Sequence, residues 1–299
     1  MTTRLRLLLP SILVVGFFLP AAADIGSAQT RSLRIMLTND DGFEAAGLKV
    51  MQAALAAAGH QVTVVAPATN MSASSMSMTS GVIKFEKKSE GVWAVYGTPA
   101  DAAVIGVVHI LRDAPPDLVV SGTNAGQNLA LSTNSSGTVN AAIAATRYGV
   151  PAIATSAGVG PNADGAYAIA ASLATRIVAA LSANRSVDGK LLPDRYVLTM
   201  NVPALPAGEL KGVKWAPLSK QASYTRVYSE TGNRDELRSQ LRPVTSAGGE
   251  TDTDLALFLQ GYVTLTLLDG DLGLRDDAAA KGVVSRLSNL ALPQPAAVR

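Results

Sequence analysis

The stretch Leu33-Arg-Ile-Met-Leu-Thr-Asn-Asp-Asp-Gly42 determines the fold that we expect for this chain. Its first half is an apolar run that ends in a polar turn, which is the pattern of a buried strand. Neighbouring side chains on a strand point to opposite faces, so Asp40 and Asp41 reach one point only if the backbone turns, as Gly42 permits. Two ionised carboxylates held together repel each other, and a bound cation removes that conflict. Two interpretations stay open here: a divalent metal site, or a plain turn between a strand and a helix.

The composition of the 299-residue chain limits the classes of function that it can have. With 48% hydrophobic and 16% charged residues, the chain suits a globular protein with a sizeable core. A net charge of +2 is too balanced for nucleic-acid binding driven by bulk charge, so we expect no nucleic-acid partner. There is no cysteine, which excludes disulfides, thiolate nucleophiles and zinc sites built on sulfur. The two histidines, His60 and His109, lie inside or at the end of apolar helical stretches and are expected to be structural.

Residues 1–28 have the pattern of a secretory signal peptide. Arg4 and Arg6 precede an apolar run that is followed by small residues. A transmembrane anchor is the alternative, but the run is shorter than the ~20 apolar residues that a spanning helix needs. No later stretch looks long and apolar enough to span a membrane. We therefore expect an exported protein, periplasmic or secreted, with no membrane contact after cleavage.

The order of the expected elements indicates an α/β fold. A strand at 33–37, a helix at 45–58 and a strand at 61–66 form a βαβ unit, which implies a parallel sheet. Further strands are expected at 117–121, 151–156 and 196–202, and further helices at 98–112, 139–148 and 163–181. Residues 29–204 are thus expected to form one core, a mostly parallel sheet with helices on both faces.

The helical periodicity of the sequence fades after about residue 205. We expect residues 205–299 to form an antiparallel extension, a C-terminal arm that closes onto the same domain. Its expected elements are strands at 213–216, 223–228 and 262–268, a short helix at 255–260, a weak helix at 276–287 and a loose tail at 293–299. A small antiparallel pair is also expected within the core, at 82–85 and 92–96.

Polar side chains follow several of the expected parallel strands, and such strand ends share one rim of a sheet. Asp40 and Asp41 follow the first strand, Ser72 the second, and the loop 122–128 the third. All are oxygen donors, which suit Mg²⁺, Mn²⁺ or Ca²⁺ better than zinc or copper. The stretch Ser135-Ser136-Gly137-Thr138 begins the next helix. It is either a phosphate cradle or merely a helix cap.

Taken in order, these motifs resemble the survival protein SurE family of metal-dependent nucleotidases. The resemblance lies in Ile35-Met-Leu-Thr-Asn-Asp-Asp-Gly42, in Val65-Ala-Pro67 followed by Asn70 and Ser72, and in Pro116-Asp-Leu-Val-Val-Ser-Gly-Thr-Asn-Ala-Gly-Gln-Asn128. It continues through Ser136-Gly-Thr-Val139 and Pro151-Ala-Ile-Ala154 to Thr253-Asp254 and Asp271. Each match is weak alone, but the matches keep their order over about residues 33–272, and this makes the set specific.

The resemblance implies that residues 29–204 are a Rossmann-like catalytic core. It also implies hydrolysis of nucleoside 5′- and 3′-monophosphates by a phosphoric monoester hydrolase of the 5′-nucleotidase type (EC 3.1.3.5). The implied metal ligands are Asp40, Asp41, Ser72 and Asn124. The implied catalytic set comprises Asp40, Asp41, Asn128, Ser136, Gly137 and Thr138. Within it, an aspartate of the pair orients or deprotonates the attacking water, and the last four residues hold the phosphate. The cofactor would be Mg²⁺ or Mn²⁺, with Ca²⁺ as a further candidate. A homodimer or higher homo-oligomer would form through the C-terminal arm.

The sequence also departs from the family pattern. Ala73 stands where the family usually has glycine after the serine, and Ala144 replaces a helical glutamate. No proposed metal ligand is lost. These departures keep a second hypothesis open, an exported binding protein that grips a phosphorylated ligand without turning it over. A third hypothesis, a sugar-nucleotide transferase, lacks a recognisable donor motif.

Overall fold

The structure of the protein is a computed structural model that describes residues 31–270. The expected signal peptide at 1–28, the helix at 276–287 and the tail at 293–299 lie outside the described residues. Of the family motif positions, Asp271 is outside them as well. Every residue expected to bind metal or phosphate lies within them.

A nine-stranded sheet runs through the described residues, in the order β3-β4-β2-β1-β5-β6-β7-β11-β8. Its centre is parallel and consists of β4 (Val92–Tyr96), β2 (Gln61–Pro67), β1 (Arg34–Thr38), β5 (Leu118–Ala125), β6 (Ala152–Ala157) and β7 (Tyr196–Val202). The edge strand β3 (Lys84–Ser89) is antiparallel to β4. In β1, Ile35 pairs with Val62 on one side and with Leu118 on the other. The mostly parallel α/β sheet expected from the sequence is confirmed.

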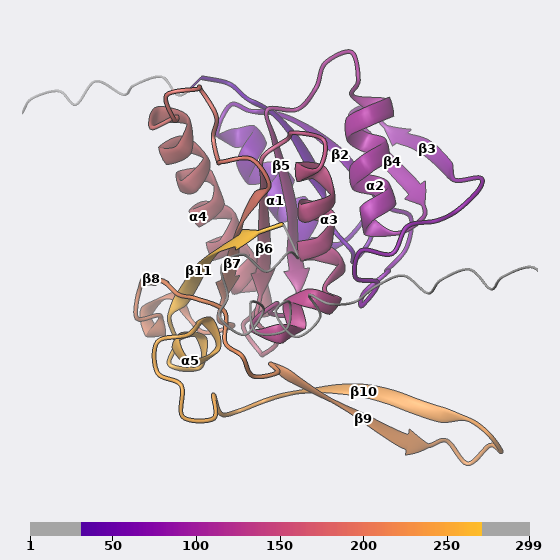
Figure 1. Ribbon diagram of the computed structural model, residues 1–299, viewed down its shortest axis with the longest axis vertical. Helices are drawn as coiled ribbons and strands as arrows, with labels where there is room; N and C mark the ends of the chain where they lie inside the picture. Colours follow the sequence, from indigo (N-terminus) through magenta and orange to yellow (C-terminus); the bar gives the residue numbers. More distant parts are fainter. Residues whose placement is uncertain (1–30, 271–299) are drawn as a thin grey trace, which may run out of the picture. The chain divides into compact units, whose positions relative to one another are not determined.

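Helices cover both faces of this sheet (Figure 1). On one face α1 (Ala46–Ala57) and α4 (Ala163–Ala183) pack in one buried cluster, and on the other α2 (Pro99–Ile105) and α3 (Gly137–Thr146) pack in a second. Side chains of β1 alternate between the two clusters: Ile35 belongs to the first and Met36 to the second. This burial on both faces explains why the strand is a continuous apolar run rather than an alternating one.

Two helices differ from their expected form. The helix expected at 98–112 begins at Pro99 with a capping box between Thr98 and Asp101, then widens into a π-helical segment at Gly106–Ile110. Helix α4 is, by length and composition, apolar enough to cross a membrane, contrary to our expectation that no later stretch would be. Its residues Ala170 and Val178 are fully buried against the sheet, which is how the core helix of a globular domain behaves.

The C-terminal region is only partly the antiparallel extension that we expected. Strand β11 (Val263–Asp269) pairs antiparallel with β7, and β8 (Val213–Trp215) pairs parallel with β11, so both complete the main sheet. Only β9 (Tyr224–Glu230) and β10 (Leu237–Pro243) form a separate antiparallel hairpin (Figure 1). The sequence did not reveal β10, since every residue in it is exposed and it lacks a buried face. Helix α5 (Asp254–Leu259) precedes β11.

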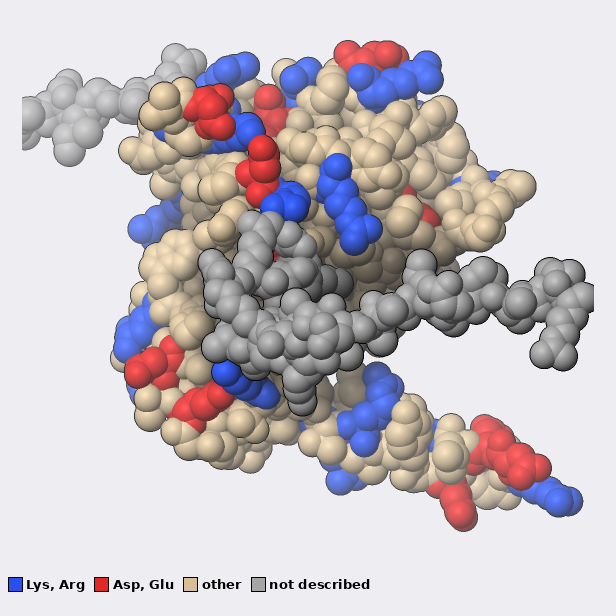
Figure 2. All heavy atoms as spheres, in the orientation of Figure 1, with Lys and Arg blue, Asp and Glu red and all other residues tan. Residues whose placement is uncertain are grey.

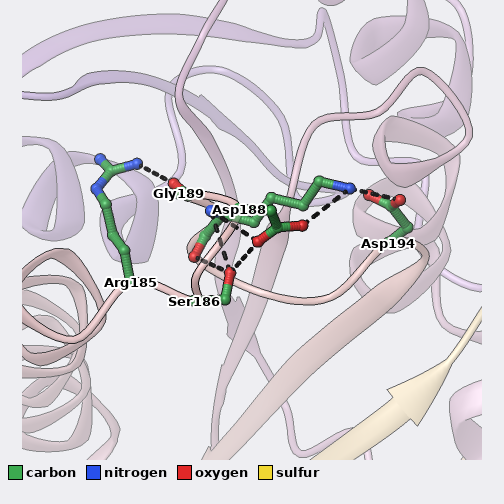
Figure 3. A network of polar contacts seen from close by, with 6 residues as sticks. Arg185, Ser186, Asp188, Gly189 and Asp194 are labelled. Carbon is green, nitrogen blue, oxygen red and sulfur yellow. Dashed lines mark hydrogen bonds and ion pairs between the residues drawn. The ribbon is translucent and has the colours of Figure 1, made fainter.

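The connection between α4 and β7 is held by a network of surface contacts (Figure 3). Arg185 donates to the backbone oxygen of Gly189 at 2.8 Å, and Ser186 donates to Asp188. Lys190 forms an ion pair with Asp194 at 2.6 Å. The side chains of Lys190 and Asp194 are exposed, so this ion pair is screened by solvent and contributes little to stability. The network closes a surface loop and lies apart from the residues of the candidate site.

Helix α1 packs so closely against β5 that Gly47 has no room for a side chain. A Cβ built on Gly47 would lie 2.1 Å from the backbone oxygen of Thr123 in β5. We expect Gly47→Ala to lower the free energy of unfolding by about 3 kcal/mol, because backbone atoms must separate to make room. Gly208→Ala is the control, since nothing lies within 4 Å of its Cβ position. Denaturant unfolding of both variants checks this, and equal stabilities would contradict the packing described.

Candidate active site

The turn after β1 is closed by Asn39 and Gly42. The side chain of Asn39 donates to the backbone oxygen of Gly42 at 2.9 Å and accepts from its backbone nitrogen at 3.2 Å. Gly42 has a φ of +105°, a conformation that glycine adopts readily and other residues rarely do. The chain therefore turns at Asp40 and Asp41, as the sequence predicted, and the turn fixes where both carboxylates start.

Asp40 lies in the turn after β1 and is buried beside the first residues of α3. Only 3% of it is exposed, and the Thr138 hydroxyl donates to its Oδ1 atom. Burial raises the pKa of Asp40 to about 6, and the charge of Asp41 adds to the rise, while the hydrogen bonds from Thr138 lower it. The partial positive charge of a helix N-terminus favours the ionised carboxylate at this position. Asp40 is thus held in place at a cost that a nearby cation would offset.

Asp41 joins two other parts of the rim. The backbone nitrogen of Ala125, at the end of β5, donates to its Oδ2 atom at 2.9 Å. The side chain of Asn70, in the loop after β2, donates to its Oδ1 atom at 3.3 Å. Burial raises the pKa of this carboxyl as well. The two aspartates are therefore neighbours that connect β1 to both adjacent strands and to α3.

The other expected metal ligands, Ser72 and Asn124, come from the strands beside β1. The loop at Ser72 is shaped by Asn70, whose Oδ1 atom accepts from the Ser72 backbone nitrogen at 2.9 Å. Asn124 was expected in a loop, but it belongs to β5, which extends to Ala125. Its side-chain nitrogen donates to the backbone oxygen of Gly126 at 2.6 Å.

The four residues expected to hold phosphate occupy different environments. Ser136 caps α3 by accepting from the Val139 nitrogen at 3.0 Å, so the capping interpretation describes its side chain in this structure. Thr138 is fully buried and donates to Asp40. Asn128 donates from its side chain to the Ser156 hydroxyl at 3.0 Å. Gly137 has no room for a side chain, because a Cβ there would lie 2.7 Å from the Cβ of Asp40.

One cavity of about 490 Å³ collects most of the expected residues. Its lining includes five of the sequence-predicted site residues: Asp40, Ser72, Asn124, Asn128 and Ser136. Asp41, Gly137 and Thr138 are not in the lining. Asp41 accepts from Ala125, which is in the lining, and the other two contact Asp40 from α3. The lining also includes Gln127, which belongs to the loop at 122–128 named above. The other walls of the cavity are residues that the sequence did not single out: Val159 and the hairpin residues Tyr224, Arg226, Leu241 and Pro243.

Comparisons with known proteins agree with this architecture. The family model described as Survival protein SurE matches residues 35–225. The chain belongs to the survival protein SurE family.

Members of the SurE family from several bacteria are similar to this chain over most of their length. The 5′-nucleotidase SurE of Nitratidesulfovibrio vulgaris (strain DSM 19637 / Miyazaki F) is 38% identical, over 85% of this chain and 91% of the relative. The 5′/3′-nucleotidase SurE of Yersinia enterocolitica is 37% identical, over 80% of this chain and 92% of the relative. The crystal structure of the SurE protein from Aquifex aeolicus superposes with a TM-score of 0.71 at 29% identity, covering 86% of this chain and 100% of that one.

Two positions that depart from the SurE pattern have clear structural settings. Ala73 adopts a φ of 63°, a left-handed conformation that the glycine usual in the family takes without strain. Ala144 is buried in the cluster beneath α3 and lies outside the lining of the cavity. Neither departure removes a polar group from the rim described above.

The residues of this site fit a hard divalent cation. Within residues 31–270 no three His, Cys, Asp or Glu side chains come together as a metal cluster, so a cation would rest on two carboxylates and neutral oxygens. Such a mixed oxygen set, open to water, is typical of Mg²⁺ or Mn²⁺ sites. The raised pKa of Asp40 supports the same assignment, because a buried carboxylate beside a second one is stabilised by positive charge. Neither histidine is in the cavity lining, and His60 accepts from the Leu33 backbone.

Proposed function

We propose that this protein is a metal-dependent phosphatase of nucleoside monophosphates, both 5′ and 3′. The convergence of Asp40, Ser72, Asn124 and Ser136 on one cavity is the observation that carries the proposal. Relatives named as 5′-nucleotidases and 5′/3′-nucleotidases, aligned over most of their length, support this substrate class. Asp40, Asp41, Ser72 and Asn124 would hold Mg²⁺, Mn²⁺ or Ca²⁺, which when bound lowers the pKa of water and polarises a phosphoryl oxygen.

In this proposal, side chains of the site orient the attacking water and hold the substrate phosphate. An aspartate of the Asp40–Asp41 pair orients the attacking water or accepts its proton. Thr138, on α3, donates to the Asp40 carboxylate and keeps it facing the cavity. The Asn70 side chain and the Ala125 backbone nitrogen donate to Asp41 and fix its position. The substrate phosphate is placed beside Ser136 and Asn128, where the helix N-terminus favours negative charge.

The compartment and the assembly are part of the same proposal. Residues 1–28 support export to the periplasm or the medium, with the mature protein free of the membrane. A homodimer or higher homo-oligomer through the C-terminal arm rests on the family resemblance. The exposed hairpin fits this assembly, because an isolated two-stranded hairpin is only marginally stable in water.

Phosphate release by the purified mature protein tests this function. We expect it to release phosphate from AMP and from 3′-AMP when Mn²⁺ or Mg²⁺ is added, and to stop after treatment with EDTA. Re-addition of the metal should restore the rate, which controls for damage by the chelator. If the protein binds AMP with metal present but returns it intact after long incubation, the binding-protein hypothesis is correct instead.

A further inference from the structure

The hairpin β9–β10 presents two chemically different faces. Residues directly opposite each other on antiparallel strands point to the same face. The pairs Tyr224–Pro243 and Arg226–Leu241 are opposite each other, and all four residues line the cavity. We call these four residues the hairpin wall. Arg242 is opposite Thr225, so it lies at the same level of the hairpin on the other face.

Tyr224 places the hairpin wall next to the metal-binding rim. Its hydroxyl lies 3.5 Å from the point that a Cβ on Gly126 would occupy, and the side-chain nitrogen of Asn124 lies 3.8 Å from the same point. Burial raises the pKa of Tyr224 to about 12, so the phenol stays neutral, and a hydrogen bond with the Gln127 backbone acts in the opposite direction. The root of the hairpin is therefore attached to the loop that follows Asn124.

Arg226 stands beside Tyr224 on the same wall. Its guanidinium donates to the Ser239 hydroxyl at 2.8 Å, and no ion pair joins it to an acidic residue within residues 31–270. Leu241 and Pro243 give it apolar neighbours. A planar guanidinium bordered by apolar side chains has the geometry to stack on the face of an aromatic ring.

We propose that the hairpin wall recognises the base of the substrate nucleotide, with Arg226 stacking on the base while the phosphate lies at the rim by Asp40 and Ser136. This inference rests on the proposed function and adds the specificity-determining residue to it. Guanidinium groups commonly stack on unpaired bases in this way. Tyr224 is the positioning residue, since it holds the root of the hairpin against the 126–127 loop.

A pair of substrates that differ only in the base tests the inference: AMP and ribose 5-phosphate. We expect Arg226→Ala to lower kcat/KM for AMP about fivefold or more, mainly through KM, and to change that for ribose 5-phosphate less than twofold. Arg226→Lys should behave like Arg226→Ala with AMP, because lysine keeps the positive charge but lacks the planar guanidinium group that stacks on a base.

Arg242→Ala is the matched control for a general loss of positive charge. Figure 2 shows several basic side chains along the hairpin and acidic ones near its turn, so charge alone could change substrate attraction. This control should leave both substrates unaffected. The inference is overturned if Arg226→Ala slows both substrates equally, if it slows neither, or if Arg226→Lys restores the rate with AMP. Should the wild type with Mn²⁺ hydrolyse neither substrate, the proposed function itself fails, and the inference fails with it.

Discussion

Asp40→Asn is expected to lower the metal-dependent kcat/KM for AMP at least about 10³-fold, and to make the metal-free protein more stable. The loss of rate follows because the substitution removes a charge from the cation site. The gain in stability follows from burial, which raises the pKa of Asp40 from 3.8 to about 6. A carboxyl whose folded-state pKa is raised binds its proton more tightly when folded. The metal-free protein therefore loses stability as the pH rises from about 4 to about 6, and above that range the loss is complete.

The size of this effect is about 3 kcal/mol at pH 7.5, since each pKa unit corresponds to about 1.4 kcal/mol. Thermal unfolding in EDTA should show Asp40→Asn melting above the wild type at pH 7.5 and level with it at pH 4. Adding Mn²⁺ should raise the melting temperature of the wild type and leave that of the variant unchanged. The assignment of Asp40 to the cation site is rejected if both proteins gain equally from Mn²⁺. It is rejected on activity if the variant retains the wild-type rate with metal present.

Gly137→Ala is expected to lower kcat/KM for AMP by about 10²-fold without unfolding the protein. The added methyl group would lie 2.7 Å from the Cβ and 2.8 Å from the Oδ2 atom of Asp40. Because α3 and β1 both belong to the packed core, the carboxylate has to move away from its position. A displacement of about 1 Å at a catalytic group is sufficient for a loss of this size. Overpacking should also lower stability by about 1–3 kcal/mol.

Gly208→Ala is the matched control for Gly137→Ala, because its Cβ position has nothing within 4 Å. The Mn²⁺ concentration needed for half-maximal rate should rise in Gly137→Ala and stay unchanged in the control. Circular dichroism and thermal unfolding establish that both variants are folded at the assay temperature. If Gly137→Ala keeps the wild-type rate and metal dependence, α3 does not fix Asp40 as the structure indicates.

The parallel core could be predicted because its signals are local. Strand β1 is an apolar run of the length of one buried strand, and Gly59 ends the helix before β2. The order strand, helix, strand restricts the connection to a parallel pair. The same rule predicted that side chains after β1, β2 and β5 would share a rim, and the cavity lining shows that Asp40, Ser72 and Asn124 do.

The C-terminal half could not be predicted in the same way, because its contacts are long-range. Strand β11 was identified from its β-branched residues, but nothing in it reveals that β7 is its antiparallel neighbour. Strand β10 has no buried face and so lacks the alternation that identifies a strand. Arg226 is in an expected strand, yet its place in the cavity depends on how that hairpin sits against the Gly126 loop.

The sequence by itself determined the parallel α/β core, the acidic turn at Asp40 and Asp41 and the oxygen chemistry of the rim, since each depends on residues close together in the chain. Only the tertiary structure decided that Thr138 binds Asp40, that Gly137 must lack a side chain, and that the hairpin supplies a wall of the cavity. The physical reason is that these contacts join residues about 100 or more positions apart. Their partners are chosen by the packing of whole elements, which local patterns do not encode.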